Sequence, residues 1–178
     1  MSIEHKMNFN SIIVRYGEIS LKGKNRKSFE LKLKADIVGF LRAREINFSR
    51  VVLKRGRIYI RGIDTVPVLE KIMGIHSYSP ALEIPRNMEA LEKEVLQFIP
   101  MIAQAKTFRV SCQRVDKRFP LKSVDLEQAI GHMLHIKSAT PVKLKDPELE
   151  FQIEIGEDGI FLFWEKVPGH RGLPFGSA

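Results

Sequence analysis

The sequence predicts an α+β fold made of two successive units. Three observations carry this prediction. Short β-branched segments alternate with longer segments of helical periodicity, the first half follows the order β-α-β-β-α-β, and a new series of helices and strands starts near Pro85. The chain has 178 residues, and its 44% apolar and 28% charged residues fit an ordinary globular protein of one domain or two small ones.

The first unit begins with a strand at Ser11–Arg15, in which β-branched residues predominate. After a glycine-containing loop, the chain is expected to enter a long helix with Asn25 as its N-cap. The apolar residues of this helix recur at helical spacing and are Phe29, Leu33, Ile37, Phe40 and Leu41. They predict a helix with one face on the core.

Two further strands, folded about Gly56, come next. A short helix is expected in residues 65–74, with Thr65 as its cap, and an extended segment in residues 75–84. This β-α-β-β-α-β order is the ferredoxin-like pattern, so we place the first domain at residues 1–84.

The second unit opens with a helix in residues 87–105, which Pro100 is expected to kink or end. A strand follows in which Phe108, Val110 and Cys112 alternate with polar residues and therefore share an apolar face. A proline-containing basic loop separates this strand from the next helix.

Ser123 is the expected cap of that helix, and a hairpin in residues 148–166 turns at the sequence GEDG. We place the second domain at residues 85–170. The tail VPGHRGLPFGSA is rich in glycine and proline, lacks periodicity and is typical of a linker or flexible end, and we assign residues 171–178 to a linker.

The charge balance favours an anionic partner. Lys and Arg outnumber Asp and Glu by 29 to 21, which gives a net charge of +8. Nucleic acid, a membrane surface or a phosphorylated small molecule are the classes that such a surplus suits. The single cysteine excludes an intramolecular disulfide, the opening residues are polar, and no apolar run approaches the roughly 20 residues that span a bilayer. These features predict a soluble cytoplasmic protein without a membrane partner.

The opening stretch RYGEISLKGKNR invites comparison with nucleotide-binding loops. A P-loop has four residues between its first glycine and the Gly-Lys pair, followed by Ser or Thr. Here five residues separate Gly17 from Gly23, and Asn25 follows Lys24, so the motif fails. The remaining cations, beside the start of a helix, suit a phosphate or simply form a solvated loop, and they are Arg15, Lys22, Lys24 and Arg26.

A second basic loop, QRVDKRFPLKS, follows the strand that contains Phe108. Its cations can neutralise phosphates while Phe119 stacks on an unpaired base. The competing interpretation packs Phe119 and Pro120 into the core and leaves the cations solvated. The cations of this loop are Arg114, Lys117, Arg118 and Lys122.

No set of residues in the sequence predicts catalysis or metal binding. Cys112 lies on an apolar strand face, which is typical of a buried structural thiol. His132 and His135 are three residues apart on a helix, but no third ligand accompanies them. We therefore expect no catalytic residue, no metal site and no cofactor in this chain.

Three segments, in order, resemble the tRNA 4-thiouridine synthetases, which are also named as thiamine-biosynthesis proteins. IIVRYGEISLKGKNRKSFE is similar to the start of that family, FRVSCQRVDKRFPLKSVDLEQAIG to its THUMP domain, and FLFWEKVPGHRGLPFGSA to the end of that domain and the link to the next. The resemblance implies a ferredoxin-like domain followed by an α/β THUMP domain that together hold tRNA.

It also implies that the THUMP domain binds the acceptor end of tRNA. The residues to which this role maps are Arg114, Lys117, Arg118, Lys122, Ser123, His170 and Arg171. The cations of the opening stretch become a second positive surface, although Tyr16 and Glu18 favour a packing role there.

In that family, the Gly-Leu-Pro stretch leads into an ATP-pyrophosphatase domain, whereas this chain stops at Ala178. The resemblance therefore implies a tRNA-binding module that does not modify tRNA, with ATP needed only by a separate or missing catalytic domain or subunit. Three alternatives stay open: the THUMP module of another tRNA-modifying enzyme, a ferredoxin-like regulatory module for small molecules, and an enzyme of thiazole synthesis.

Overall fold

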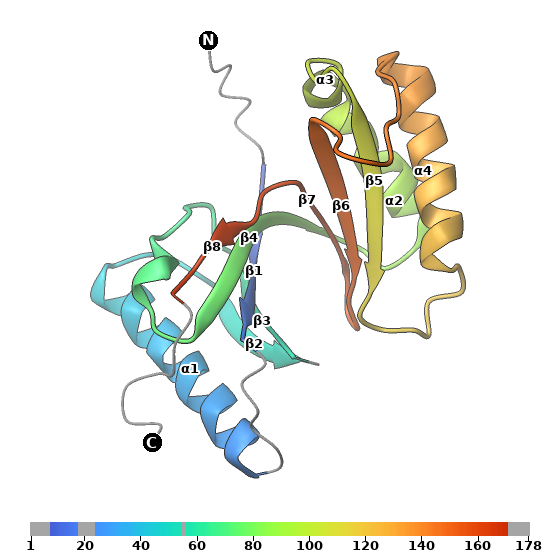
Figure 1. Ribbon diagram of the computed structural model, residues 1–178. Helices are drawn as coiled ribbons and strands as arrows, with labels where there is room; N and C mark the ends of the chain where they lie inside the picture. Colours follow the sequence, from blue (N-terminus) through green and yellow to red (C-terminus); the bar gives the residue numbers. More distant parts are fainter. Residues whose placement is uncertain (1–7, 18–23, 55, 171–178) are drawn as a thin grey trace. The chain divides into compact units, whose positions relative to one another are not determined.

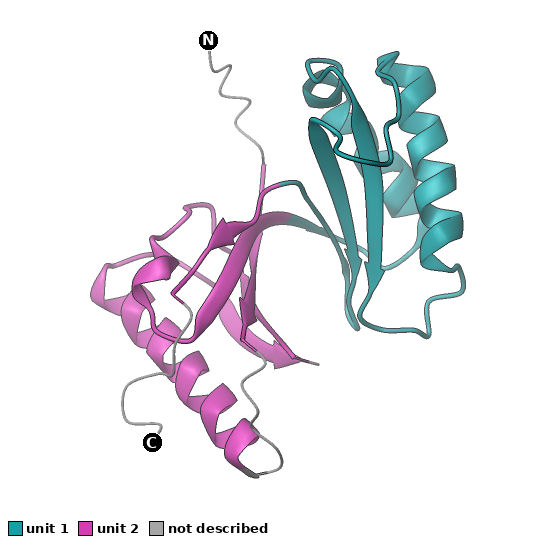
Figure 2. Ribbon diagram, viewed as in Figure 1, with its two compact units in different colours: residues 1–7, 82–164 teal, residues 8–81, 165–178 magenta. Residues whose placement is uncertain are grey.

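The computed structural model describes residues 8–17, 24–54 and 56–170 (Figure 1). They form two compact units, coloured separately in Figure 2. The N-terminal unit contains residues 8–81 and the segment that follows residue 164, and the C-terminal unit contains residues 82–164. The sequence placed the division at residue 84, three residues later, and assigned residues 165–170 to the second domain.

The N-terminal unit is an antiparallel sheet covered on one face by a long helix. Its elements are β1 (Ser11–Tyr16), α1 (Lys24–Ala43), β2 (Arg50–Lys54), β3 (Arg57–Arg61), a single 3₁₀ turn η1 (Leu69–Lys71) and β4 (Ile75–Ile84). The strand order is β2-β3-β1-β4, and each neighbouring pair is antiparallel. The predicted apolar face of α1 packs on this sheet, because Phe29, Leu33, Ile37 and Leu41 are all buried. The expected ferredoxin-like fold is confirmed.

Two local predictions in this unit are wrong. The helix expected in residues 65–74 is reduced to η1, and the Thr65 hydroxyl bonds the Asp64 carboxylate rather than capping a helix. The segment is short, and its Val-Pro-Val run disfavours helical geometry before Leu69. The long helix begins at Lys24, so Asn25 lies in its first turn instead of at its cap.

The chain returns to this unit after residue 164. Strand β8 (Val167–Pro168) pairs antiparallel with β4, opposite Tyr78 and Ser77, and the Gly169 amide donates to the His76 carbonyl at 2.8 Å. A β-carbon on Gly169 would lie 2.3 Å from the Ile75 carbonyl oxygen, so only glycine fits this approach. The tail from Val167 onward lacks periodicity and resembles a linker in the sequence, but its residues Val167 and Pro168 form this strand.

The C-terminal unit consists of a four-stranded sheet and two helical segments. Its elements are α2 (Met88–Glu94), η2 (Val95–Phe98), α3 (Ile99–Ile102), β5 (Phe108–Arg114), α4 (Ser123–Ser138), β6 (Leu149–Ile155) and β7 (Ile160–Phe163). The end of β4 pairs with β7, then β6 and β5 follow, with β5 and β6 parallel. Pro100 lies at the start of α3, after the 3₁₀ segment, so the expected break occurs just before it.

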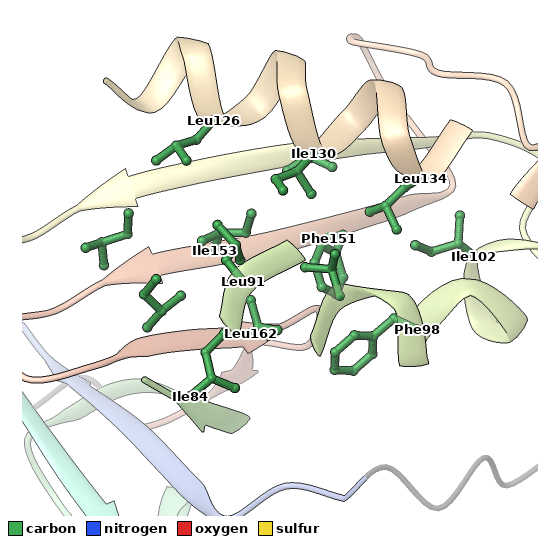
Figure 3. Packing of buried hydrophobic residues seen from close by; sticks show 14 of the residues in the cluster. Ile84, Leu91, Phe98, Ile102, Leu126, Ile130, Leu134, Phe151, Ile153 and Leu162 are labelled. Carbon is green, nitrogen blue, oxygen red and sulfur yellow. The ribbon is translucent and has the colours of Figure 1, made fainter. Parts of the chain in front are cut away.

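Both helical segments of this unit pack on the same face of the sheet. Figure 3 shows Leu126, Ile130 and Leu134 of α4 turned toward the strands, with Leu91 and Phe98 of the other segment beside them. The inward strand residues are those that alternate in the sequence, among them Phe108, Val110, Phe151, Ile153 and Ile155. The predicted periodicity therefore defines the core.

Two glycines of the N-terminal unit predict opposite responses to alanine. Gly39 lies on the exposed side of α1, and a β-carbon there would meet no atom within 4 Å, so Gly39→Ala should stabilise the unit by about 0.5–1 kcal/mol. Gly62 has φ +67°, and its β-carbon would lie 1.9 Å from Ser49 Oγ. Gly62→Ala should therefore cost about 1 kcal/mol or more in urea unfolding. Equal stability of the two variants would contradict this account.

Candidate nucleic-acid interface

A buried carboxylate organises the basic loop between β5 and α4, residues 115–122. The Asp116 side chain is 1% exposed. It accepts hydrogen bonds from Arg118 Nε at 3.0 Å and Nη2 at 2.8 Å, and from Arg86 Nη2 at 3.0 Å. The Arg118 hydrogen bonds, helped by the charges of both guanidinium groups, hold the pKa of Asp116 well below its usual range. The carboxylate is therefore ionised and fixes the conformation of the loop.

Arg86 connects this loop to the turn of the β6–β7 hairpin. Its Nε donates to the Gly156 carbonyl at 3.0 Å, and its guanidinium lies 5.4 Å from the centre of the Phe119 ring. Since Arg86 contacts Asp116 as well, one side chain joins three separate segments of the C-terminal unit.

Phe119 and Arg114 have partners within the protein. The Phe119 side chain is 4% exposed and belongs to the core, so the packing interpretation is confirmed and base stacking by this ring is excluded. Arg114 turns back on the loop, where its Nη1 donates to the carbonyls of Phe119 at 3.2 Å and Leu121 at 3.1 Å. Both residues shape the loop from inside.

The loop presents its remaining cations outward. Lys117 and Lys122 are exposed, and neither side chain makes an ion pair or hydrogen bond with the part of the chain that is described. The Arg118 side chain is 65% exposed although it is held by Asp116. Positive charge is thus displayed on a backbone that Asp116 and Arg114 have already ordered.

Ser123 is the first residue of α4 and not its cap. The capping position belongs to Lys122, which makes no capping hydrogen bond through its side chain. The Ser123 hydroxyl instead interacts with the Cys112 thiol, and this contact opposes the effect of burial on that thiol. Ser123 therefore links the start of α4 to the neighbouring strand.

The opening basic stretch is only partly described. Arg15 Nη1 donates to Ser79 Oγ at 3.0 Å on the sheet, and Arg26 Nε donates to Glu30 Oε1 at 2.9 Å. Lys22 lies outside the described residues, and only the backbone of Lys24 is described. Tyr16 packs within its own unit, where its hydroxyl donates to Glu30 at 2.7 Å and burial raises its pKa.

Of the two tail residues assigned to RNA binding, only His170 lies within the described residues. His170 is exposed and comes directly after β8, so it belongs to the N-terminal unit and not to the unit of the basic loop. Arg171 lies outside the described residues.

The Cys112 thiol and the His135 ring, which were considered for reactivity or metal binding, both interact with other groups of the protein. Burial raises the pKa of Cys112 to about 11, so the thiol is protonated at neutral pH and is a poor nucleophile. His135 Nδ1 lies 2.8 Å from the Thr140 carbonyl oxygen at the end of α4. Within the described ranges, no three His, Cys, Asp or Glu side chains come together in a way that could hold a metal ion. No helix in those ranges is both long and apolar enough to cross a membrane.

Sequence reasoning missed Arg86 and Asp116. Asp116 was counted as an ordinary member of a basic loop, and Arg86 follows Pro85 at the start of the second unit. The only sign of this pairing in the sequence is that Asp116 directly precedes two cations. That pattern does not reveal that Asp116 pairs with Arg86, which lies 30 residues earlier in the chain.

Two sequence families match the chain. The ThiI ferredoxin-like domain matches residues 11–79, and the THUMP domain matches residues 85–165. A probable tRNA sulfurtransferase of Natranaerobius thermophilus is 35% identical over 186 residues, which cover 95% of this chain and 44% of the relative. The chain thus spans less than half the length of that relative.

Two solved structures are also similar. PH1313 from Pyrococcus horikoshii superposes with a TM-score of 0.86 and 31% identity, over 94% of this chain and 58% of that protein. A 4-thiouridine synthetase in complex with RNA and with bound ATP superposes with a TM-score of 0.78 and 26% identity, over 96% of this chain and 44% of that protein.

The role of Asp116 predicts a specific pH dependence. Asp116→Asn should lower the melting temperature at pH 7 by several degrees, because Arg86 and Arg118 lose their anion. A group with a depressed folded-state pKa stabilises above its unfolded value of about 3.9 and loses this effect as the pH falls toward the folded value. The difference from the wild type should therefore shrink as the pH is lowered below about 4.

Thermal melts from pH 7 down to pH 2 measure this difference, with Asp146→Asn as the control. Asp146 is exposed and has φ 51°, a conformation that asparagine tolerates. A constant difference across the pH range would show that the Asp116 charge is not responsible.

Proposed function

We propose that this chain, which consists of a ThiI ferredoxin-like domain and a THUMP domain, binds tRNA for 4-thiouridine formation. Its role is to hold the acceptor end of the tRNA for an ATP-dependent catalytic domain or subunit. The place of action is the cytoplasm, where the tRNA is. ATP binding and sulfur transfer belong to the catalytic partner.

The observation that carries this proposal is the similarity to the 4-thiouridine synthetase that was solved with RNA. That similarity extends over 96% of this chain, and so includes both units rather than the THUMP domain alone. The match of residues 11–79 to the ThiI ferredoxin-like domain favours thiouridine formation over the other tRNA modifications that use THUMP domains.

The chemistry of the 115–122 loop supports contact with RNA phosphates. Lys117 and Lys122 are exposed and can reach a phosphate. Arg118 is oriented by a buried carboxylate, so its side chain loses little conformational freedom when a phosphate binds. Unpaired RNA ends offer both phosphates and free base edges to a protein loop, whereas duplexes are recognised mainly through shape and backbone. The loop therefore fits the unpaired 3′ end of the acceptor arm.

We expect whole tRNA to bind with a strong dependence on salt. Lys117→Ala with Lys122→Ala should weaken binding and make the slope of log K against log salt shallower by roughly 0.7–0.9 for each lost phosphate contact. Fluorescence titrations at several salt concentrations measure both effects. Arg118 is left intact because its loss would also strip Asp116 of a partner.

Two comparisons make this test specific. Lys93→Ala with Lys106→Ala removes the same charge from exposed positions elsewhere in the C-terminal unit. Removing the unpaired 3′ end of the tRNA should weaken binding as the loop variant does, and combining the two changes should add little, since both remove one contact. If the trimmed tRNA binds as well as the intact one, the loop does not hold the acceptor end.

The 178-residue chain should not form thiouridine by itself. Cys112 is protonated at neutral pH, and the opening stretch does not have the spacing of a P-loop. Incubation with tRNA, ATP and a sulfur donor should therefore give no 4-thiouridine absorbance. Thiolation above that of a protein-free blank would contradict the assignment of catalysis to a partner.

A further inference from the structure

The positive charge of the chain is concentrated in the N-terminal unit. Residues 8–81 contain 15 Lys and Arg against 6 Asp and Glu, whereas residues 82–164 contain 11 against 13. The C-terminal unit, which carries the basic loop, is therefore slightly acidic as a whole. An electrostatic attraction to a polyanion has to come mainly from the other unit.

Helix α1 accounts for much of this surplus. It contains six Lys and Arg and only two acidic residues. The two acids are already paired within the helix, Glu30 with Arg26 at 2.9 Å and Asp36 with Lys32 at 3.3 Å. The helix is left with several cations that no acid of its own neutralises.

Three of these cations form a row on the solvent side of α1. Lys27, Lys34 and Arg42 are seven and eight residues apart, which places them within about 80° of one another around the helix. They make no ion pair or hydrogen bond through their side chains with any described residue. Lys27 and Arg42 are exposed and Lys34 is half-buried. The row is about 22 Å long, at 1.5 Å per residue.

The character of this face favours the backbone of a duplex over an unpaired strand. Proteins that run along a single strand combine cations with aromatic side chains on which successive bases stack, whereas a short unpaired end can also be held through its phosphates and base edges. The large side chain that is exposed beside the row is Leu31, which is not aromatic. Phe40 lies on another side of α1, and the Arg44 guanidinium covers its ring, with Cζ 3.6 Å from the ring centre. A straight row of cations without an aromatic platform matches a regular line of phosphates.

We propose that the solvent face of α1, marked by Lys27, Lys34 and Arg42, binds the phosphate backbone of double-stranded RNA. The inference rests on the proposed function, because the double-stranded RNA is taken to be the base-paired part of the tRNA. It adds a second surface, on a different unit from the loop that binds the unpaired end.

The test compares two variants that lose the same charge. The first is Lys27→Ala with Lys34→Ala and Arg42→Ala, which places a strong helix former at each position. The control is Lys93→Ala with Lys106→Ala and Lys145→Ala, which removes three exposed cations from the C-terminal unit. Circular dichroism verifies that both remain folded.

Each protein is titrated with whole tRNA and with a blunt RNA duplex of about two helical turns. The α1 variant should bind both RNAs at least about tenfold more weakly at 0.1 M salt, with a salt slope shallower by roughly 2–3, because three phosphate contacts are lost. The control should stay close to the wild type. Removing the 3′ end of the tRNA should weaken the α1 variant further, since the two contacts are independent.

The outcomes separate this inference from the proposed function. If the wild-type chain binds tRNA tightly but the α1 variant and the control lose affinity equally, only net charge matters and the α1 surface is refuted. If the α1 variant loses affinity for tRNA but the wild type does not bind the blunt duplex, duplex recognition is refuted. If the wild type binds no tRNA at low salt, the proposed function itself fails.

Discussion

The ion pairs around Asp116 are the constraint on which the basic loop depends. A carboxylate that is almost fully removed from water must be paired with cations or become protonated, and Arg86 and Arg118 supply that pairing. The loop is thereby joined to the start of the C-terminal unit and, through Gly156, to the β6–β7 turn. Arg114 completes the arrangement by binding the loop carbonyls. The cations of the loop repel one another, and the single buried carboxylate of Asp116 holds the loop in one conformation.

The sequence was informative where one periodic pattern decides a structure. Alternation at Phe151, Ile153 and Ile155 predicted β6, and helical spacing from Phe29 to Leu41 predicted the buried face of α1. These patterns succeed because burial of a whole face depends on local spacing. The two-residue strand β8 escaped prediction because its pairing depends on an edge of β4 about 90 residues earlier in the chain, and two residues cannot display a period.

For the candidate site, the sequence located the charges but not their roles. Four cations in one loop looked equivalent, yet Arg114 faces inward, Arg118 is tied to Asp116, and Lys117 and Lys122 face solvent. Such differences depend on side-chain partners that are distant in the sequence. The distribution of charge between the units became visible only once their limits were known. In the proposed complex, the N-terminal unit supplies general attraction to RNA, and the C-terminal loop supplies recognition of an end.

The return of the chain to β4 through β8 also affects how the protein is made. The N-terminal unit takes its last strand from residues that are synthesised after the whole of the C-terminal unit. A nascent chain can complete β1 to β4 early, but that sheet keeps an open edge along β4 until Gly169 has left the ribosome. The C-terminal unit has no such delay, because residues 82–164 are contiguous. The second unit in the sequence can therefore be the first to reach its final structure, reversing the usual order of folding during translation.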